Sequence, residues 1–164
     1  MKNWNIIAAI GNRGELGKQN HLLCRLPKDL KNFQLLTTGH TVLMGRHTWD
    51  SLFIRPLPNR RNIVLSTSVN ILPKCEVFAT LAQAMQSISA TEQCFVIGGA
   101  SIYEQTINQV DTLYLTRILS NFEADVFFPL DFLEHFILKS DIFVPKDKDN
   151  AFDCRFQKWI RCID

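Results

Sequence analysis

The sequence predicts an α/β fold: a mostly parallel, twisted central sheet with helices on both faces and an antiparallel C-terminal edge. Over the first two thirds of the chain, short apolar segments rich in β-branched residues alternate with segments of helical periodicity. This alternation is typical of parallel strands joined by right-handed crossovers. The last third carries strand-like segments with no helical segment between them, which indicates antiparallel strands added at one edge.

The elements of the first half follow in order. Residues 4–10 are apolar and β-branched at their centre, which predicts a buried strand. A glycine-rich loop runs from Gly11 to Pro27, and residues 28–37 predict a helix because Leu30, Phe33 and Leu36 are spaced along one side. Further strands are expected at residues 41–44, 62–66 and 76–78, a helix at residues 46–52, and a turn at residues 56–59.

The second half has two further helices and four strands. Thr80 is placed to cap a helix in which apolar residues recur at helical spacing from Leu81 to Ile88. Ser101 and Glu104 have the spacing of a capping box that would open the next helix. The strands are expected at residues 94–97, 113–118, 136–144 and 152–160.

Composition limits the class of protein. The 164 residues are 46% hydrophobic, and 18 Lys and Arg against 16 Asp and Glu give a formal net charge of +2. This length fits one domain over residues 1–164, and the small net charge provides no basic footprint for a nucleic acid. The apolar run at residues 6–10 is too short for a signal-peptide core, and no segment approaches a membrane span. We therefore expect a cytoplasmic monomer with neither a membrane nor a nucleic-acid partner.

The five cysteines and four histidines show no metal-ligand spacing. There is neither a C-x-x-C pair nor an H-E-x-x-H motif, so we expect no metal site and no disulfide framework. Free thiols in a reducing compartment are the simpler interpretation.

Two strand-to-helix junctions are candidate anion sites. At Gly98 and Gly99 a strand ends and a helix begins, so free backbone N–H groups and close approach favour a diphosphate. The alternative is a tight turn that needs a positive φ. The junction at residues 44–48 has the same layout and adds Arg46 and His47. Two such junctions on one sheet suggest a dinucleotide, with Arg46 on a 2′-phosphate or, alternatively, simply solvated.

Asp29 occupies a costly position for a carboxylate. It lies on the apolar side of the predicted helix with Phe33 and Leu36, where a ligand with paired N–H donors would offset burial of the charge. The alternative is a first-turn Asp that is favoured by the helix dipole. Arg55, Arg60 and Arg61 flank the proline-rich turn, where they form either a clamp for a substrate carboxylate or a solvated basic loop.

Taken together and in this order, these segments resemble the dihydrofolate reductase family of bacterial type. The similarity spans nearly the whole chain, and no single motif carries it. The matching segments are Ile7 to Ala9, Leu16-Gly17, Leu26 to Leu30, Met44 to Ser51, Pro56 to Arg60 with Asn62-Ile63, Ile97 to Gly99 with Tyr103, Tyr114 to Thr116, and Asp125 with Phe128-Pro129.

The resemblance implies hydride transfer from NADPH to carbon 6 of dihydrofolate, protonation at nitrogen 5, and a site that also takes antifolate inhibitors. The implied catalytic residues are Leu22, Asp29 and Thr116. The implied substrate contacts are Ile7, Ala8, Asp29, Leu30, Phe33, Leu52, Arg55, Arg60, Ile97, Tyr103 and Thr116. The implied NADPH contacts are Ala9, Leu16, Gly17, Gly45, Arg46, His47, Thr48, Leu65, Ser66, Thr67, Gly98, Gly99, Ala100, Ser101, Ile102, Tyr103 and Gln105. The loop from Gly11 to Cys24 would close over the nicotinamide.

The sequence departs from the family pattern at a few positions. Leu23 and Cys24 stand where the family usually has Pro-Trp, Ala100 replaces a glycine, and Ser101 replaces a frequent basic residue. Two alternative functions follow: a folate- or nucleotide-binding protein of low activity, and a related NADPH reductase of another pteridine-like substrate.

Overall fold

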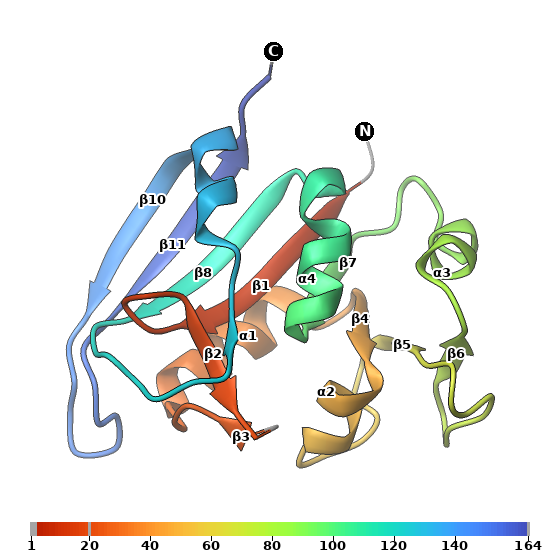
Figure 1. Cartoon of the computed structure of the whole chain (residues 1–164), viewed down its shortest axis with the longest axis horizontal. Coiled ribbons are helices and arrows are strands. Elements are labelled where there is room, and N and C mark those ends of the chain that lie inside the picture. Colours follow the sequence, from red (N-terminus) through yellow and green to blue (C-terminus); the bar gives the residue numbers. More distant parts are fainter. Residues whose placement is uncertain (1–2, 20, 164) are drawn as a thin grey trace.

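A computed structural model describes residues 3–19 and 21–163, and their fold is α/β (Figure 1). An eight-stranded sheet runs in the order β10-β11-β8-β1-β7-β4-β5-β6. Along this order, each strand from β8 to β6 is parallel to the next one. At the other end, β11 is antiparallel to both β8 and β10. The predicted parallel centre and antiparallel edge are therefore confirmed. The strands are β1 (Trp4–Ile10), β4 (Thr41–Gly45), β5 (Arg61–Leu65), β6 (Glu76–Phe78), β7 (Cys94–Gly98), β8 (Thr112–Ile118), β10 (Phe136–Val144) and β11 (Cys154–Arg161).

Helices cover both faces of this sheet. Alternate strand residues point to opposite sides, so each face carries apolar side chains that need covering. Ile6 and Val96 belong to an apolar cluster with α3 (Leu81–Ser87) and α4 (Ala100–Thr106), and α4 crosses in front of β1 and β7 in Figure 1. The neighbouring residues Ile7 and Phe95 belong to a second cluster, with α1 (Pro27–Thr37) and α2 (Arg46–Ser51). The central parallel strands β1, β4, β5 and β7 are thus buried on both faces, as their apolar sequences predict, whereas the edge strand β10 is mostly exposed.

A three-stranded sheet that joins the glycine-rich loop to residues 126–127 was not expected. It consists of β2 (Glu15–Lys18), β3 (His21–Leu22) and β9 (Val126–Phe127), in the order β3-β2-β9. Two 3-10 helices, η1 (Ile107–Gln109) and η2 (Leu130–His135), were also not expected. Strands of two to four residues are too short for alternation to be visible, and β9 pairs with a segment far away in the sequence.

The two predicted helix caps had different outcomes. Thr80 forms a capping box with Gln83, as its position suggests. The predicted capping box at Ser101 is wrong: Gly99 is the N-cap of α4, and Ser101 lies inside the helix, where its hydroxyl accepts a hydrogen bond from Gln105. The turn at Gly98 and Gly99 starts the helix before Ser101, so the serine is not available as a cap.

No helix within residues 3–19 and 21–163 is long and apolar enough to cross a membrane. In the same residues, no group of three or more His, Cys, Asp or Glu side chains is arranged to hold a metal ion.

Candidate active site

The candidate site lies where the parallel strands β1, β4, β5 and β7 end. Because β4 and β7 are parallel neighbours, with Met44 paired to Gly98, the two glycine junctions lie side by side. Gly98 has a φ of +127° and is joined to Gly99 by a cis peptide bond. A Cβ on Gly98 would lie 3.2 Å from Thr48 Oγ1 and 3.3 Å from the Tyr103 hydroxyl oxygen. Both the positive φ and the close approach therefore require glycine here.

Tyr103 joins α4 to the end of β1. Its hydroxyl donates a 2.8 Å hydrogen bond to the carbonyl oxygen of Ile7, and its side chain is buried. Burial raises the pKa of Tyr103, and the charge of Asp29 raises it further. The phenol therefore stays protonated and keeps its donor role at neutral pH.

Asp29 extends from α1 toward β8. The Thr116 hydroxyl donates a 2.6 Å hydrogen bond to Asp29 Oδ1, and Thr116 is paired with Ala9 of β1. Burial raises the pKa of Asp29, and the Thr116 hydrogen bond offsets part of that rise. A buried carboxyl group of raised pKa can bind or exchange a proton nearer neutral pH than an exposed one.

Two cysteines lie close enough to Asp29 to feel its charge. Burial raises the pKa of the Cys24 thiol, and Asp29 raises it further. The same two causes, in the same order, raise the pKa of Cys154 to about 11. The position where the family usually has Trp is thus held by a protonated, partly buried thiol beside the carboxylate.

Apolar side chains form a wall on the α1 side of the sheet. Ile7, Phe33, Leu52 and Ile97 belong to one cluster, so the structure brings these four predicted substrate contacts together. Ala8 points to the opposite face, where its side chain belongs to the other cluster, so only its backbone is available on the α1 side. Two leucines predicted at the site are open to solvent: Leu30 is 43% exposed and Leu22, on β3, is 72% exposed.

The three arginines near the proline-rich turn point in different directions. Arg60 lies against α1: its Nη1 donates to Thr37 Oγ1 at 3.0 Å, and its guanidinium stands 5.8 Å from the centre of the Phe33 ring. Arg55 is exposed, with Nη1 3.6 Å from Asp50 Oδ1. Of the three, Arg60 is therefore the one that the structure places beside the apolar wall.

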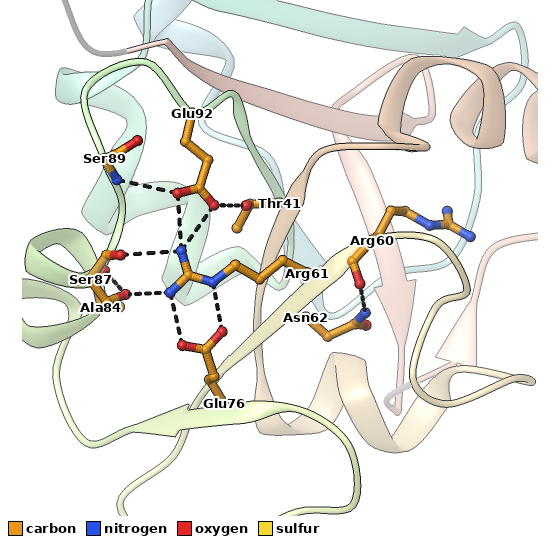
Figure 2. A network of polar contacts seen from close by, with 9 residues as sticks. All are labelled: Thr41, Arg60, Arg61, Asn62, Glu76, Ala84, Ser87, Ser89 and Glu92. Atoms are coloured by element: carbon orange, nitrogen blue, oxygen red, sulfur yellow. Dashed lines mark hydrogen bonds and ion pairs between the residues drawn. The ribbon is translucent and has the colours of Figure 1, made fainter.

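Arg61 points away from this site. Figure 2 shows its guanidinium between the carboxylates of Glu76 and Glu92, with further contacts to Ser87. A shallow hollow lies beside this network, at the edge where the parallel strands begin. Because the guanidinium is already paired there, Arg61 is not part of a carboxylate clamp.

The residues predicted to contact the cofactor phosphates surround the two junctions. Arg46 Nε donates to both carboxylate oxygens of Asp50, at 3.0 and 3.1 Å, while His47 is exposed. Ser66 is buried, and its Oγ accepts hydrogen bonds from the Ser68 and Val69 backbone N–H groups. The chain therefore holds Arg46 and Ser66 in place through internal contacts.

The remaining predicted contacts are found in the following places. Gly45 and Leu65 end β4 and β5, and Thr67 follows β5 as an exposed residue. Ala100, Ile102 and Gln105 lie on α4, and Leu16 and Gly17 lie on β2.

Glu15 is a residue of the loop that sequence reasoning missed. Its side chain is fully buried; Oε1 accepts from the Arg13 backbone N–H at 2.5 Å and Oε2 from that of Phe122 at 2.8 Å. Burial alone would raise the pKa of Glu15, but the backbone hydrogen bonds outweigh it and the pKa is lowered. The predicted closing loop is therefore held to the segment before β9 through Glu15; Asn20 of that loop lies outside the described residues.

The comparisons with known proteins agree with this geometry. The family model described as dihydrofolate reductase matches residues 3–161. The chain is 39% identical over 142 residues to a dihydrofolate reductase of Bacillus subtilis, covering 86% of this chain and 84% of that protein. It is 34% identical over 153 residues to one of Haemophilus influenzae, covering 93% and 95%.

A solved structure shares the fold. The dihydrofolate reductase from Enterococcus faecalis, complexed with NADP(H) and RAB-propyl, superimposes with a TM-score of 0.89 at 28% sequence identity. The match covers 98% of this chain and 96% of that one. With a family model over nearly the whole chain and two relatives above 30% identity, the chain belongs to the dihydrofolate reductase family.

Proposed function

We propose that this chain reduces 7,8-dihydrofolate to 5,6,7,8-tetrahydrofolate with NADPH, and that antifolate inhibitors bind in the same site. The observation that carries the proposal is the Thr116–Asp29 pair. It sets a carboxyl group of raised pKa beside an apolar wall, in a chain of this family. A pterin ring is flat, largely apolar on its faces and lined at one edge with N–H groups, so it suits a carboxylate that lies beside apolar side chains.

The roles proposed for the chain's own residues follow from their chemistry. Asp29 would accept hydrogen bonds from the amino group and a ring nitrogen of the pterin and favour protonation at nitrogen 5. Thr116 would orient the Asp29 carboxylate through the 2.6 Å hydrogen bond. Ile7, Phe33 and Leu52 would flank the rings and exclude water, and Arg60 would pair with a substrate carboxylate.

The residues at the two junctions fit NADPH. Gly98 and Gly99 carry no side chain that would shield the backbone N–H groups at the start of α4, which favours close approach by a diphosphate. We propose that Gly98 to Ile102 receive the diphosphate, and that Arg46 and Ser66 lie toward the adenosine phosphates. When bound, the cofactor supplies the hydride that goes to carbon 6. The protein holds the two reactants in line, which accounts for a large part of such a rate enhancement.

The wider setting is also a proposal. We infer that the chain works as one domain over residues 1–164, as a monomer in the cytoplasm, with no nucleic-acid or membrane partner. Its small net charge of +2 supports the absence of a nucleic-acid partner, because it provides no extended basic surface.

One assay tests the activity. We expect dihydrofolate-dependent oxidation of NADPH, followed by the loss of NADPH absorbance, with micromolar enzyme. Tight binding of folate and NADPH without turnover would instead indicate a binding protein. A higher rate with another pteridine-like substrate than with dihydrofolate would indicate a related reductase.

A further inference from the structure

Residues 57–60 form a turn that is tied together by one buried side chain. Asn62 follows the turn at the start of β5 and is only 4% exposed. Its Nδ2 donates to the carbonyl oxygens of Leu57 and Arg60, both at 3.0 Å, and its Oδ1 accepts from the Leu57 backbone N–H at 2.9 Å. Both N–H groups of the amide and one of its acceptor sites are thus used on the backbone of the turn.

The guanidinium of Arg60 is anchored to the same turn. Its Nε donates to the Pro58 carbonyl oxygen at 2.8 Å, and its Nη1 donates to Thr37 on α1. Within the turn, Asn59 adopts a φ of +58°, and its carbonyl oxygen accepts from the Gly39 backbone N–H at 2.8 Å. The place of the guanidinium therefore depends on the backbone that Asn62 holds.

Figure 2 separates this arrangement from the neighbouring ion-pair network. The Arg61 side chain extends toward Glu76 and Glu92, while Asn62 contacts the Arg60 carbonyl on the other side. Arg61 therefore fixes the start of β5 in the sheet, and Asn62 fixes the shape of the turn before it. This division allows the two effects to be measured apart.

We propose that Asn62 is a positioning residue for Arg60 and thereby sets how tightly the enzyme holds the carboxylate-bearing tail of its substrate. The inference rests on the proposed function, because it takes Arg60 as the group that pairs with that tail. A side chain that cannot make the three bonds would leave two carbonyl oxygens and one N–H group unpaired at a buried place. The turn would then rearrange and displace the guanidinium, which must meet a carboxylate in a defined bidentate geometry.

The test compares two substrates in two variants. Asn62→Ser shortens the side chain, and Asn62→Asp keeps its shape and the acceptor but removes both donors. Dihydrofolate carries the glutamate tail, whereas dihydropteroate has the same rings without it. We expect KM for dihydrofolate to rise at least about fivefold in both variants, with KM for dihydropteroate and kcat changed less than about twofold. An equal rise for both substrates, or none for either, would overturn the proposal.

The ratio of the two KM values does not depend on how much of a variant is folded, so reduced stability leaves the test readable. In an Arg60→Ala background we expect no further change of the ratio on adding Asn62→Ser, and a persisting effect would show that Asn62 does not act through Arg60. Arg61→Met is the matched control on the other side of the strand. We expect it to lower the thermal midpoint and to leave the ratio of the two KM values unchanged. The wild-type rate with dihydrofolate tests the proposed function, whereas the ratio of KM values in the variants tests the role of Asn62. Failure of one proposal can therefore be told apart from failure of the other.

Discussion

Replacement of Asp29 by Asn should lower activity and raise stability in the same protein. Asp29 is partly buried, and among the described residues the hydrogen bond to its carboxylate comes from Thr116 at 2.6 Å. Asparagine keeps the shape and accepts the same bond through its Oδ1, but it neither ionises nor exchanges a proton. The substitution therefore removes the chemistry and the cost of burying the charge together.

The two effects have different sizes. Loss of a group that assists proton transfer costs about 10²–10⁴-fold in rate, so kcat should fall at least about a hundredfold at neutral pH. Burial raises the pKa of Asp29 in the folded state, so its ionised form destabilises the ligand-free fold at neutral pH. Removing that form should stabilise the fold by about 1–2 kcal/mol, which raises the midpoint by about 2–8 °C.

The pH dependence of the stability gained in Asp29→Asn identifies the cause of that gain. The cost of the buried charge is full above the folded pKa and disappears as the pH falls below the unfolded pKa, which is about 3.9 for Asp. In thermal unfolding without ligand, the midpoint of Asp29→Asn should therefore exceed that of the unsubstituted protein at pH 7, and the difference should shrink toward pH 3. Asp131→Asn, at an exposed position, serves as the control and should change neither quantity. Near-normal turnover of Asp29→Asn, or a lower midpoint at pH 7, would refute the reasoning.

Three further outcomes follow from the same structure. Gly98→Ala puts a Cβ 3.2 Å from Thr48 Oγ1 at a φ of +127°, so the free energy of unfolding should fall by about 2–5 kcal/mol in chemical denaturation; an unchanged value would contradict this packing. Arg61→Met should lower stability by about 1–2 kcal/mol at neutral pH, since the ion pairs are partly exposed. Because Arg61 holds the pKa of Glu76 below its usual value, that contribution is present above about pH 4.3 and is lost as the pH falls through the lowered folded pKa, so the stabilities of the two proteins should converge on acidification. Cys24→Trp should raise kcat or tighten dihydrofolate binding in steady-state assays, and a clear drop in both would mean that the pocket is adapted to the thiol.

Local patterns were enough to predict the strands of the eight-stranded sheet and to single out residues for the candidate site. The strands at Trp4–Ile10 and Phe136–Val144 have the predicted bounds. The first is almost entirely apolar, and the second has aromatic and β-branched residues at both ends, so neither needs a partner to be recognised. Asp29 was singled out because a carboxylate on an apolar helix face is costly, and the raised pKa reflects that cost. Gly98 was singled out because a strand that ends in two glycines before a helix suggests a special backbone.

The features that the sequence did not predict depend on contacts between distant segments. Three arginines in one short stretch look equivalent, yet only the packed structure sends Arg60 to α1 and Arg61 to Glu76 and Glu92. Glu15 looks like a surface residue until Phe122 is brought to it.

The sequence by itself determined the α/β class, the order of the main elements and the chemistry at single positions, because periodicity and residue type act over a few neighbours. The tertiary structure alone decided which other polar groups meet, as in the hydrogen bond from the Phe122 backbone to Glu15 and the three bonds of Asn62. The physical reason is that a hydrogen bond depends on position to within a fraction of an ångström. Such positions are set by the packing of the whole sheet and its helices, which no local pattern contains.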